Sequence, residues 1–253
     1  MDIVKKKDKK EIKLKIFCDF DGTITKNDVW VSALGKFIKD KNQFQIVCDE
    51  FINNRITARE CIKRELELVE DFNFELFDSY LATEELDEYF KEFLAYCENN
   101  GYEIVLLSEG LDYYIDYILN REKIELKYFS NRLITRNENE KIKISCEFPY
   151  SDEVCAYCGM SKRNIIVNNT NDYDNEISVF IGDGVSDFCG SNYADIVFAK
   201  KRLASYCWKK NITYYEYKNF KDIINKLQKL KEIHKLKQRQ NAKVLRRDIF
   251  FGG

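Results

Sequence analysis

Hydrophobic positions along this chain follow two patterns. Short, mostly apolar runs, which are typical of strands buried on both faces of a sheet, occur at 14–18, 104–107 and 177–181. The long stretch 30–98 instead spaces its apolar residues three or four positions apart, and this spacing predicts helices. Buried strands that alternate with helices predict an α/β fold, in which helices cover both faces of a parallel sheet. A mostly helical insertion is expected after the first strand.

Polar side chains follow each of the three apolar runs. They are Asp19 and Asp21 after the first run, Ser108 after the second, and Asp183 and Asp187 after the third. Because ligands of parallel α/β sheets bind beyond the carboxyl ends of the strands, we expect these side chains to meet at one edge of the sheet. The sequence therefore predicts a site that contains four carboxylates.

Four neighbouring carboxylates need a positive partner. Two unit charges 4 Å apart interact by about 1 kcal/mol in water and by roughly 4 kcal/mol at an effective dielectric constant of 20, so like charges repel by these amounts. A hard divalent cation with oxygen ligands offsets this repulsion. Mg²⁺ fits best, because it binds one or two carboxylates together with a phosphate oxygen. The predicted cofactor is therefore Mg²⁺, and Lys162 is the second candidate cation.

Four short motifs, in this order, resemble those of the haloacid dehalogenase superfamily of phosphatases with an aspartate nucleophile. They are Asp19-Phe20-Asp21-Gly22-Thr23, Ser108, Lys162, and Gly182-Asp183-Gly184-Val185-Ser186-Asp187. The complete set is a more specific signal than any one motif alone. The resemblance implies an α/β, three-layer Rossmann-like core with a parallel sheet and an inserted helical cap of the C1 type.

Within this superfamily, the chain looks most like the branch that contains phosphoserine phosphatase. More narrowly, it is similar to the phosphatases that act on a phosphorylated methylthio-pentene intermediate of methionine salvage. The second motif reads Ser108-Glu109-Gly110 here, whereas the methionine-salvage enzymes typically have Ser-Gly-Gly. This departure leaves the fold and the reaction intact, and it leaves the substrate open.

The resemblance implies a role for each motif residue. Asp19 would be the nucleophile, because a carboxylate is already ionised at neutral pH. Asp21 would protonate the leaving group and later take a proton from the attacking water. The implied metal ligands are Asp19, Asp21 through its backbone carbonyl, Asp183 and Asp187. The implied phosphate-binding residues are Gly22, Thr23, Ser108, Glu109, Gly110 and Lys162, of which Lys162 is also counted as catalytic.

These roles predict a Mg²⁺-dependent hydrolase that cleaves a phosphomonoester through an aspartyl-phosphate, with a small phosphorylated metabolite as its partner. A dehalogenase of the same superfamily would lack the second acid, so Asp21 argues against that activity. Two alternatives stay open. One is a phosphotransferase or phosphomutase that keeps both acids, and the other is a non-catalytic phosphate-binding module with intact motifs.

The predicted boundaries follow from the insertion between the first two motifs. Residues 11–25 and 98–217 are expected to form the core domain, 26–97 the helical cap, and 218–253 a basic C-terminal helix and tail. The cap is expected to close over the site and exclude water. Candidate substrate-selecting residues of the cap, which we leave outside the predicted site, are Asp28, Trp30, Arg55, Arg59 and Arg64.

Charge is distributed unevenly along the chain. The formal net charge of the 253 residues is -2, yet residues 218–253 carry 11 Lys and Arg against 3 Asp and Glu. Residues 1–217 are therefore acidic. The basic segment also carries apolar residues on one predicted helical face, at Phe220, Ile223, Ile224, Leu227 and Leu230. Such a helix most often packs its apolar face on its own sheet, so contact with nucleic acid or a membrane surface is the less expected alternative.

Nine cysteines are scattered through a chain long enough to fold without disulfides, so free thiols and a cytoplasmic location are expected. The start of the chain lacks the apolar stretch of a secretion signal, and no segment has the apolar length of a membrane span. Cys155 and Cys158 form a Cys-x-x-Cys pair, which is compatible with half of a zinc site, a redox pair or ordinary thiols. Ordinary thiols are the preferred interpretation, because no second pair of this spacing occurs and the only histidine, His234, lies in the basic segment. The sequence does not predict the oligomeric state.

Overall fold

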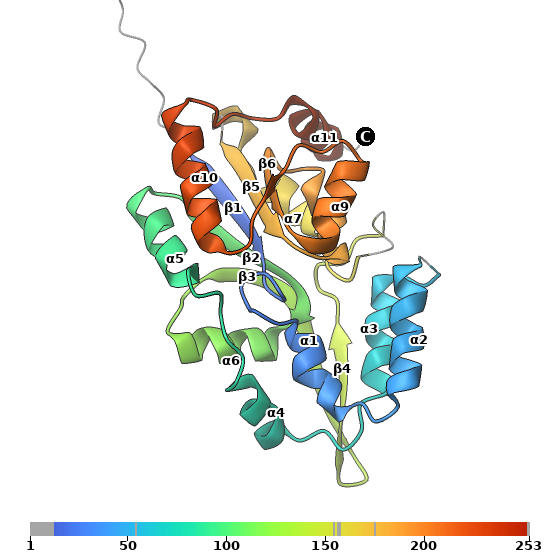
Figure 1. Cartoon of the computed structure of the whole chain (residues 1–253). Helices are drawn as coiled ribbons and strands as arrows, with labels where there is room; N and C mark the ends of the chain where they lie inside the picture. Colours follow the sequence, from blue (N-terminus) through green and yellow to red (C-terminus); the bar gives the residue numbers. More distant parts are fainter. Residues whose placement is uncertain (1–12, 54, 154, 156–157, 175, 252–253) are drawn as a thin grey trace, which may run out of the picture.

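A seven-stranded sheet forms the centre of the protein in the computed structural model, which describes residues 13–53, 55–153, 155, 158–174 and 176–251 (Figure 1). The strand order is β4-β3-β2-β1-β5-β6-β7. The strands are β1 (Leu14–Asp19), β2 (Glu103–Leu111), β3 (Lys127–Glu138), β4 (Lys141–Glu147), β5 (Ile177–Gly182), β6 (Ile196–Ala199) and β7 (Tyr215–Glu216). All neighbouring pairs are parallel except the β3–β4 hairpin. The predicted α/β fold with a mostly parallel sheet is confirmed.

Some predicted segments extend beyond the described residues. Residues 11 and 12 of the predicted core, residue 54 of the predicted cap, residues 154, 156, 157 and 175 within the core, and residues 252 and 253 of the basic segment lie outside them. Among the described residues, no helix combines the length and the apolar character needed to cross a membrane.

Strand β1 lies in the middle of the sheet, and every one of its residues is buried. Successive side chains of a strand point to opposite faces, so Ile16 and Cys18 join the apolar cluster on one face whereas Phe17 joins the cluster on the other. The parallel register pairs Cys18 with Leu106 of β2 and with Ile181 of β5. This register brings the ends of the three strands that carry the predicted motifs to the same edge.

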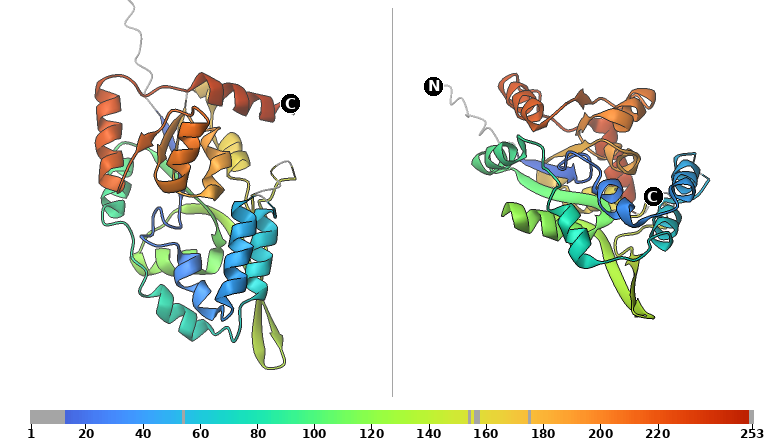
Figure 2. Two further views of the ribbon diagram at one scale, coloured as in Figure 1. Left: turned by 45° about the vertical axis from the view of Figure 1, so that its right-hand side comes forward. Right: turned by 60° about the horizontal axis from the view of Figure 1, so that its bottom comes forward.

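Helices cover both faces of the sheet, as Figures 1 and 2 show. The helices α5 (Phe90–Asn99), α6 (Asp112–Glu122) and α10 (Phe220–Glu232) bury their apolar side chains in the first cluster. The opposite cluster includes side chains of α7 (Lys162–Asn169) and α9 (Lys201–Lys209), and the short α8 (Phe188–Ser191) packs beside them. The five apolar residues expected on one face of α10 are all buried, as predicted. The core therefore has three layers.

The segment between β1 and α5 contains the elements expected for a cap. They are α1 (Val29–Ser32), a 3₁₀ turn η1 (Leu34–Phe37), α2 (Lys41–Ile52), α3 (Ala58–Glu67) and α4 (Phe74–Leu81). Helices α2 and α3 pack side by side, and α3 contacts β4, so the β3–β4 hairpin supports this pair (Figure 1). Helix α5, which falls largely within the predicted cap, packs instead against α10 through Phe90, Phe93 and Phe220.

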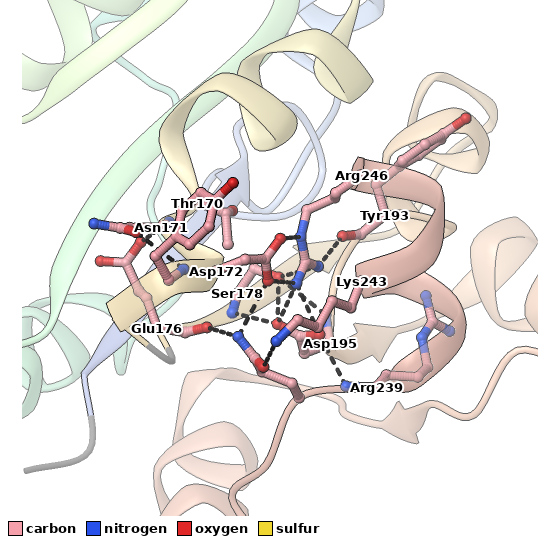
Figure 3. Close-up of polar contacts among 12 residues, drawn as sticks. Thr170, Asn171, Asp172, Glu176, Ser178, Tyr193, Asp195, Arg239, Lys243 and Arg246 are labelled. Atoms are coloured by element: carbon pink, nitrogen blue, oxygen red, sulfur yellow. Dashed lines mark hydrogen bonds and ion pairs between the residues drawn. The ribbon is translucent and has the colours of Figure 1, made fainter. Parts of the chain in front are cut away.

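The final helix, α11 (Gln240–Phe250), is attached to the core by a buried ion-pair network (Figure 3). Arg246 is only 2% exposed, and its Nη2 lies 2.5 Å from Oδ1 of Asp172 and 3.2 Å from both carboxylate oxygens of Asp195. Its Nη1 donates to the backbone carbonyl of Tyr193 and to Oγ of Ser178. The basic segment therefore inserts one of its arginines into the core rather than exposing its whole charge to solvent.

We expect Arg246→Met to lower the free energy of unfolding by about 3–5 kcal/mol, because it leaves buried carboxylates without their cation. The urea midpoint measured by circular dichroism tests this. The matched control is Arg247→Met, since Arg247 is the next residue of α11 and is exposed. Equal urea midpoints for the two variants would show that the network does not stabilise the fold.

Candidate active site

Lys162 lies at the centre of the predicted site. It begins α7, whose N-cap Ser161 accepts a hydrogen bond from the backbone N–H of Asn164. The Lys162 side chain is fully buried, and its Nζ lies 2.6 Å from Oδ1 of Asp19 and 2.7 Å from Oδ1 of Asp187. The structure thus brings together residues from β1, from α7 and from the loop after β5.

Three carboxylates gather at this site, and two of them contact the ammonium group of Lys162. Asp19, Asp183 and Asp187 each offer an oxygen, and these oxygens all lie within 4.8 Å of one another. Asp187 is fixed in place because its Oδ2 accepts hydrogen bonds from the backbone N–H groups of Asp183 and Gly184, at 2.8 and 2.9 Å. A side chain at Gly182 would collide with the Asp187 carboxylate, so only glycine fits there.

This cluster fits a hard divalent cation such as Mg²⁺, because carboxylate oxygens are the protein ligands that Mg²⁺ prefers. The cluster contains three of the four predicted metal ligands. The carboxylate of the fourth, Asp21, is not part of it. The ligand assignment itself stays a prediction.

The charges of Asp19 and Lys162 depend on each other. Burial raises the pKa of Asp19 well above its ordinary value, the neighbouring Asp187 raises it further, and Lys162 opposes both effects. Burial alone would lower the pKa of Lys162, but Asp187 and Asp19 outweigh burial and raise it. Lys162 therefore stays charged and balances part of the negative charge around it.

Asp21 lies in different surroundings from Asp19, although only one residue separates them. Its Oδ1 accepts a hydrogen bond from the backbone N–H of Val29 at 3.1 Å. Its Oδ2 accepts from Oγ of Ser108 at 3.0 Å and from the hydroxyl of Tyr114 at 2.8 Å. Burial, followed by the charge of Asp28, raises the pKa of Asp21 to about 7. A carboxyl group with this pKa exchanges protons near neutral pH.

The second motif lies inside β2 rather than after it. The apolar run predicts a strand that ends at Leu107, but β2 continues to Leu111 with a shift of register between these two residues. The backbone N–H of Gly110 donates to Oγ of Ser108 at 2.9 Å. This irregular stretch turns Ser108 toward Asp21, and the apolar pattern carries no signal for such a shift.

The remaining predicted phosphate-binding residues take part in local contacts. Gly22 has a φ of +68°, and its N–H donates to the carbonyl of Asn27 and to Oγ1 of Thr25. The N–H of Thr23 donates to the carbonyl of Phe20. Their assigned contact with phosphate stays a prediction, because both N–H groups donate within their own turn here.

Glu109 lies near Lys162 and supports the loop that precedes it. Its Oε1 accepts a hydrogen bond from the N–H of Gly159 at 3.2 Å. Burial raises the pKa of Glu109 to about 7, and Lys162 opposes this shift. The second motif therefore holds a carboxyl group that contacts the loop before Lys162.

Sequence reasoning missed Tyr114 and Lys201. Tyr114 lies four residues after Gly110, in the first turn of α6. Its closeness in sequence to the second motif was the signal that could have identified it. Lys201 begins α9 directly after β6, the strand next to β5, and its Nζ lies 2.8 Å from Oδ2 of Asp183. Strand order decides this second contact, and strand order could not be derived from one sequence.

A cavity of about 480 Å³ opens between these carboxylates and the cap segment. Its cap side is mostly apolar and includes Trp30, Val31, Phe44, Phe51, Ile52 and Ile62. Of the five candidate substrate-selecting residues, Asp28 and Trp30 line this cavity whereas the three arginines do not. Arg64 pairs with Glu50, and Arg59 donates to the backbone carbonyl of Cys158. Among the described residues, the basic residues of the lining are Lys201 and Arg202, which belong to the core.

Comparisons with known proteins find similar sequences and similar folds. The chain is 27% identical over 223 residues to a 2-hydroxy-3-keto-5-methylthiopentenyl-1-phosphate phosphatase of Bacillus cereus, and the alignment covers 87% of this chain and 98% of that protein. A phosphoserine phosphatase solved with an analogue of the phospho-aspartyl intermediate has a TM-score of 0.64 and 19% identity, covering 85% of this chain and 98% of that one. A substrate-bound phosphoserine phosphatase gives a TM-score of 0.63 and 20% identity over the same shares. At these identities the solved structures show the fold alone.

The family assignment rests on a separate comparison. Residues 16–190, which include all four motifs, match the family model of haloacid dehalogenase-like hydrolases. The matched region spans more than half of the chain, and the resemblance inferred from the motifs is confirmed. The chain belongs to the haloacid dehalogenase-like hydrolases.

Proposed function

We propose that the protein is a Mg²⁺-dependent phosphatase that hydrolyses a small phosphomonoester through an aspartyl-phosphate on Asp19. The observation that carries this proposal is the buried Lys162, whose ammonium group contacts both Asp19 and Asp187 within a cluster of three carboxylates. Such a site needs one cation to keep the nucleophile ionised and further positive charge to attract a phosphate dianion. Mg²⁺ bound by the carboxylate cluster would supply that charge.

The first step transfers the phosphoryl group to the protein. An oxygen of Asp19 attacks phosphorus, a new oxygen–phosphorus bond forms, and the ester bond to the leaving oxygen breaks. The leaving alkoxide takes a proton from Asp21, whose raised pKa of about 7 favours the protonated form that this step requires. Lys162 holds the Asp19 carboxylate and offsets negative charge during the transfer.

The second step returns Asp19 to its starting state. Asp21, now ionised, takes a proton from a water molecule as the water oxygen attacks phosphorus, and the bond between Asp19 and phosphorus breaks. The product is inorganic phosphate. The hydrogen bonds from Val29, Ser108 and Tyr114 hold the Asp21 carboxyl group in one orientation during both steps.

The cavity favours a substrate with an uncharged apolar tail. Its cap side presents mostly aromatic and aliphatic side chains together with the carboxyl groups of Asp28 and Glu65, and no basic cap residue lines it in the described part of the chain. A substrate carboxylate buried against this cap side would have no cap cation to pair with, at a cost of several kcal/mol. The substrate in the name of the Bacillus cereus relative carries an uncharged methylthio tail. Phosphoserine instead carries both an ammonium and a carboxylate group.

We expect purified protein with Mg²⁺ to release inorganic phosphate from an aryl phosphate and to lose this activity in excess EDTA. Phosphate release should be faster from the methylthiopentenyl phosphate than from phosphoserine, with kcat/KM higher by at least about tenfold, because the phosphoserine carboxylate would meet no cap cation among the described lining residues. A colorimetric phosphate assay measures all three substrates.

The same assay separates the two alternatives. A phosphomutase would need a bisphosphate activator and would release little phosphate per substrate consumed. A non-catalytic module would bind phosphomonoesters in calorimetry without any phosphate release. Full activity in EDTA would contradict the proposed metal requirement, and a preference for phosphoserine would contradict the substrate class.

A further inference from the structure

Three cysteines meet outside the carboxylate cluster. Cys155 and Cys158 lie on the segment between β4 and α7, and Cys189 lies in α8. The three sulfur atoms all lie within 4.8 Å of one another, and Sγ of Cys155 is 3.6 Å from Sγ of Cys189. Cys155 and Cys158 are paired as a disulfide in this structure, with their Cα atoms 5.6 Å apart. The third thiol therefore lies beside a pair whose spacing already suits a metal.

The separation of these sulfurs fits thiolate coordination. Zinc binds thiolates at about 2.3 Å in tetrahedral geometry, which places two coordinated sulfurs about 3.8 Å apart. The 3.6 Å between Cys155 and Cys189 is close to this value. A disulfide would use only two of the three sulfurs, whereas a metal ion uses all three. We propose that the reduced form of Cys155, Cys158 and Cys189 binds one Zn²⁺ through three thiolates.

The proposed zinc site is distinct from the carboxylate cluster. Soft thiolate ligands select zinc, whereas carboxylate oxygens suit Mg²⁺. Within the described residues, the two candidate metal-binding groups share no member. Three protein ligands leave the fourth zinc position to water or to a small exogenous ligand. The two metals can therefore be distinguished by their ligand chemistry.

The position of the three cysteines gives the zinc site a structural role near the reaction. Cys158 lies four residues before Lys162, and Cys189 lies two residues after Asp187. A metal that joins these cysteines would connect the two segments whose side chains meet at 2.7 Å in the Lys162–Asp187 ion pair. The segment between β4 and α7 also contacts the cap segment, because Arg59 of α3 donates to the backbone carbonyl of Cys158 at 3.1 Å.

Cobalt substitution tests this inference directly. The full chain is reduced, freed of metal and titrated with Co²⁺ in the presence of excess Mg²⁺. We expect a thiolate-to-cobalt charge-transfer band in the near ultraviolet that saturates at one equivalent and disappears on addition of Zn²⁺. Cys189→Ser should weaken Zn²⁺ binding by at least about tenfold, because it removes one ligand of three.

Two control variants locate the metal. Cys146→Ser removes a partly buried thiol of β4 outside the cluster and should leave the cobalt band unchanged. Asp183→Asn should also leave the band unchanged, which excludes binding at the carboxylates. The reduced wild-type protein decides the question even if a variant fails to fold. Absence of the charge-transfer band, or an unchanged band in Cys189→Ser, would overturn the proposal. Because the measurement is spectroscopic, its outcome does not depend on phosphatase activity.

Discussion

The Asp19→Asn variant is expected to lose phosphate release by at least about 10⁴-fold, because an amide oxygen does not form the covalent intermediate. The substitution keeps the size of the side chain. It also replaces a buried carboxylate whose pKa is raised by burial and by Asp187, so the fold should tolerate the neutral amide. Steady-state phosphate release and the thermal unfolding midpoint, measured on the same preparation, test both expectations.

A control and a direct chemical test accompany this variant. Asp116→Asn makes the same substitution at an exposed position of α6, where the carboxylate accepts a hydrogen bond from Tyr128, and should leave activity unchanged. Wild-type protein that is quenched with acid during turnover of a substrate labelled in its phosphoryl group should carry that label. The Asp19→Asn variant should carry none. Labelling that persists in Asp19→Asn would refute Asp19 as the nucleophile.

The Lys162→Met variant is expected to lower kcat by about 10²–10³-fold, because it removes a preorganised positive group from the charge that develops in the transition state. Without Mg²⁺, it should also lower the free energy of unfolding by about 3–5 kcal/mol, since Asp19 and Asp187 lose their buried cation. Kinetics with saturating Mg²⁺ and urea unfolding in EDTA measure the two effects.

Lys201→Met is the matched comparison. Lys201 also contacts an active-site carboxylate, Asp183, but its side chain is 59% exposed. Exposed ion pairs contribute little, so the unfolding free energy should change by less than about 1 kcal/mol. If both lysine variants lost the same stability, burial of Lys162 would not explain its importance.

Much of the core was predictable because buried strands have a simple pattern. The apolar runs at 14–18 and 177–181 became β1 and β5, and the rule that parallel strands end at one edge predicted that Asp19 and Asp183 would meet. The contact between Tyr114 and Asp21 was not predictable in the same way. It depends on how α6 packs after a shift of register in β2, and hydrophobic periodicity does not encode that shift.

Two other features also depend on tertiary packing that the sequence pattern does not encode. The sequence predicted that the basic segment packs an apolar helical face on the sheet, but it carried no signal that Arg246 is buried, where α11 turns it toward Asp172 and Asp195. The Cys-x-x-Cys pair was interpreted as ordinary thiols because no second pair follows it. The third cysteine joins them because α8, which follows β5 after a 3₁₀ turn, packs against α7.

The sequence by itself determined the fold class, the four motifs and the residue types available for chemistry, because these depend on local pattern and spacing. The tertiary structure alone decided which carboxylates contact Lys162, which carboxyl groups have a pKa of about 7, and which cap side chains line the cavity. The physical reason is that hydrogen bonds, ion pairs and burial act over a few ångströms between segments far apart in the chain. Their partners are fixed only when the strands have found their order and register.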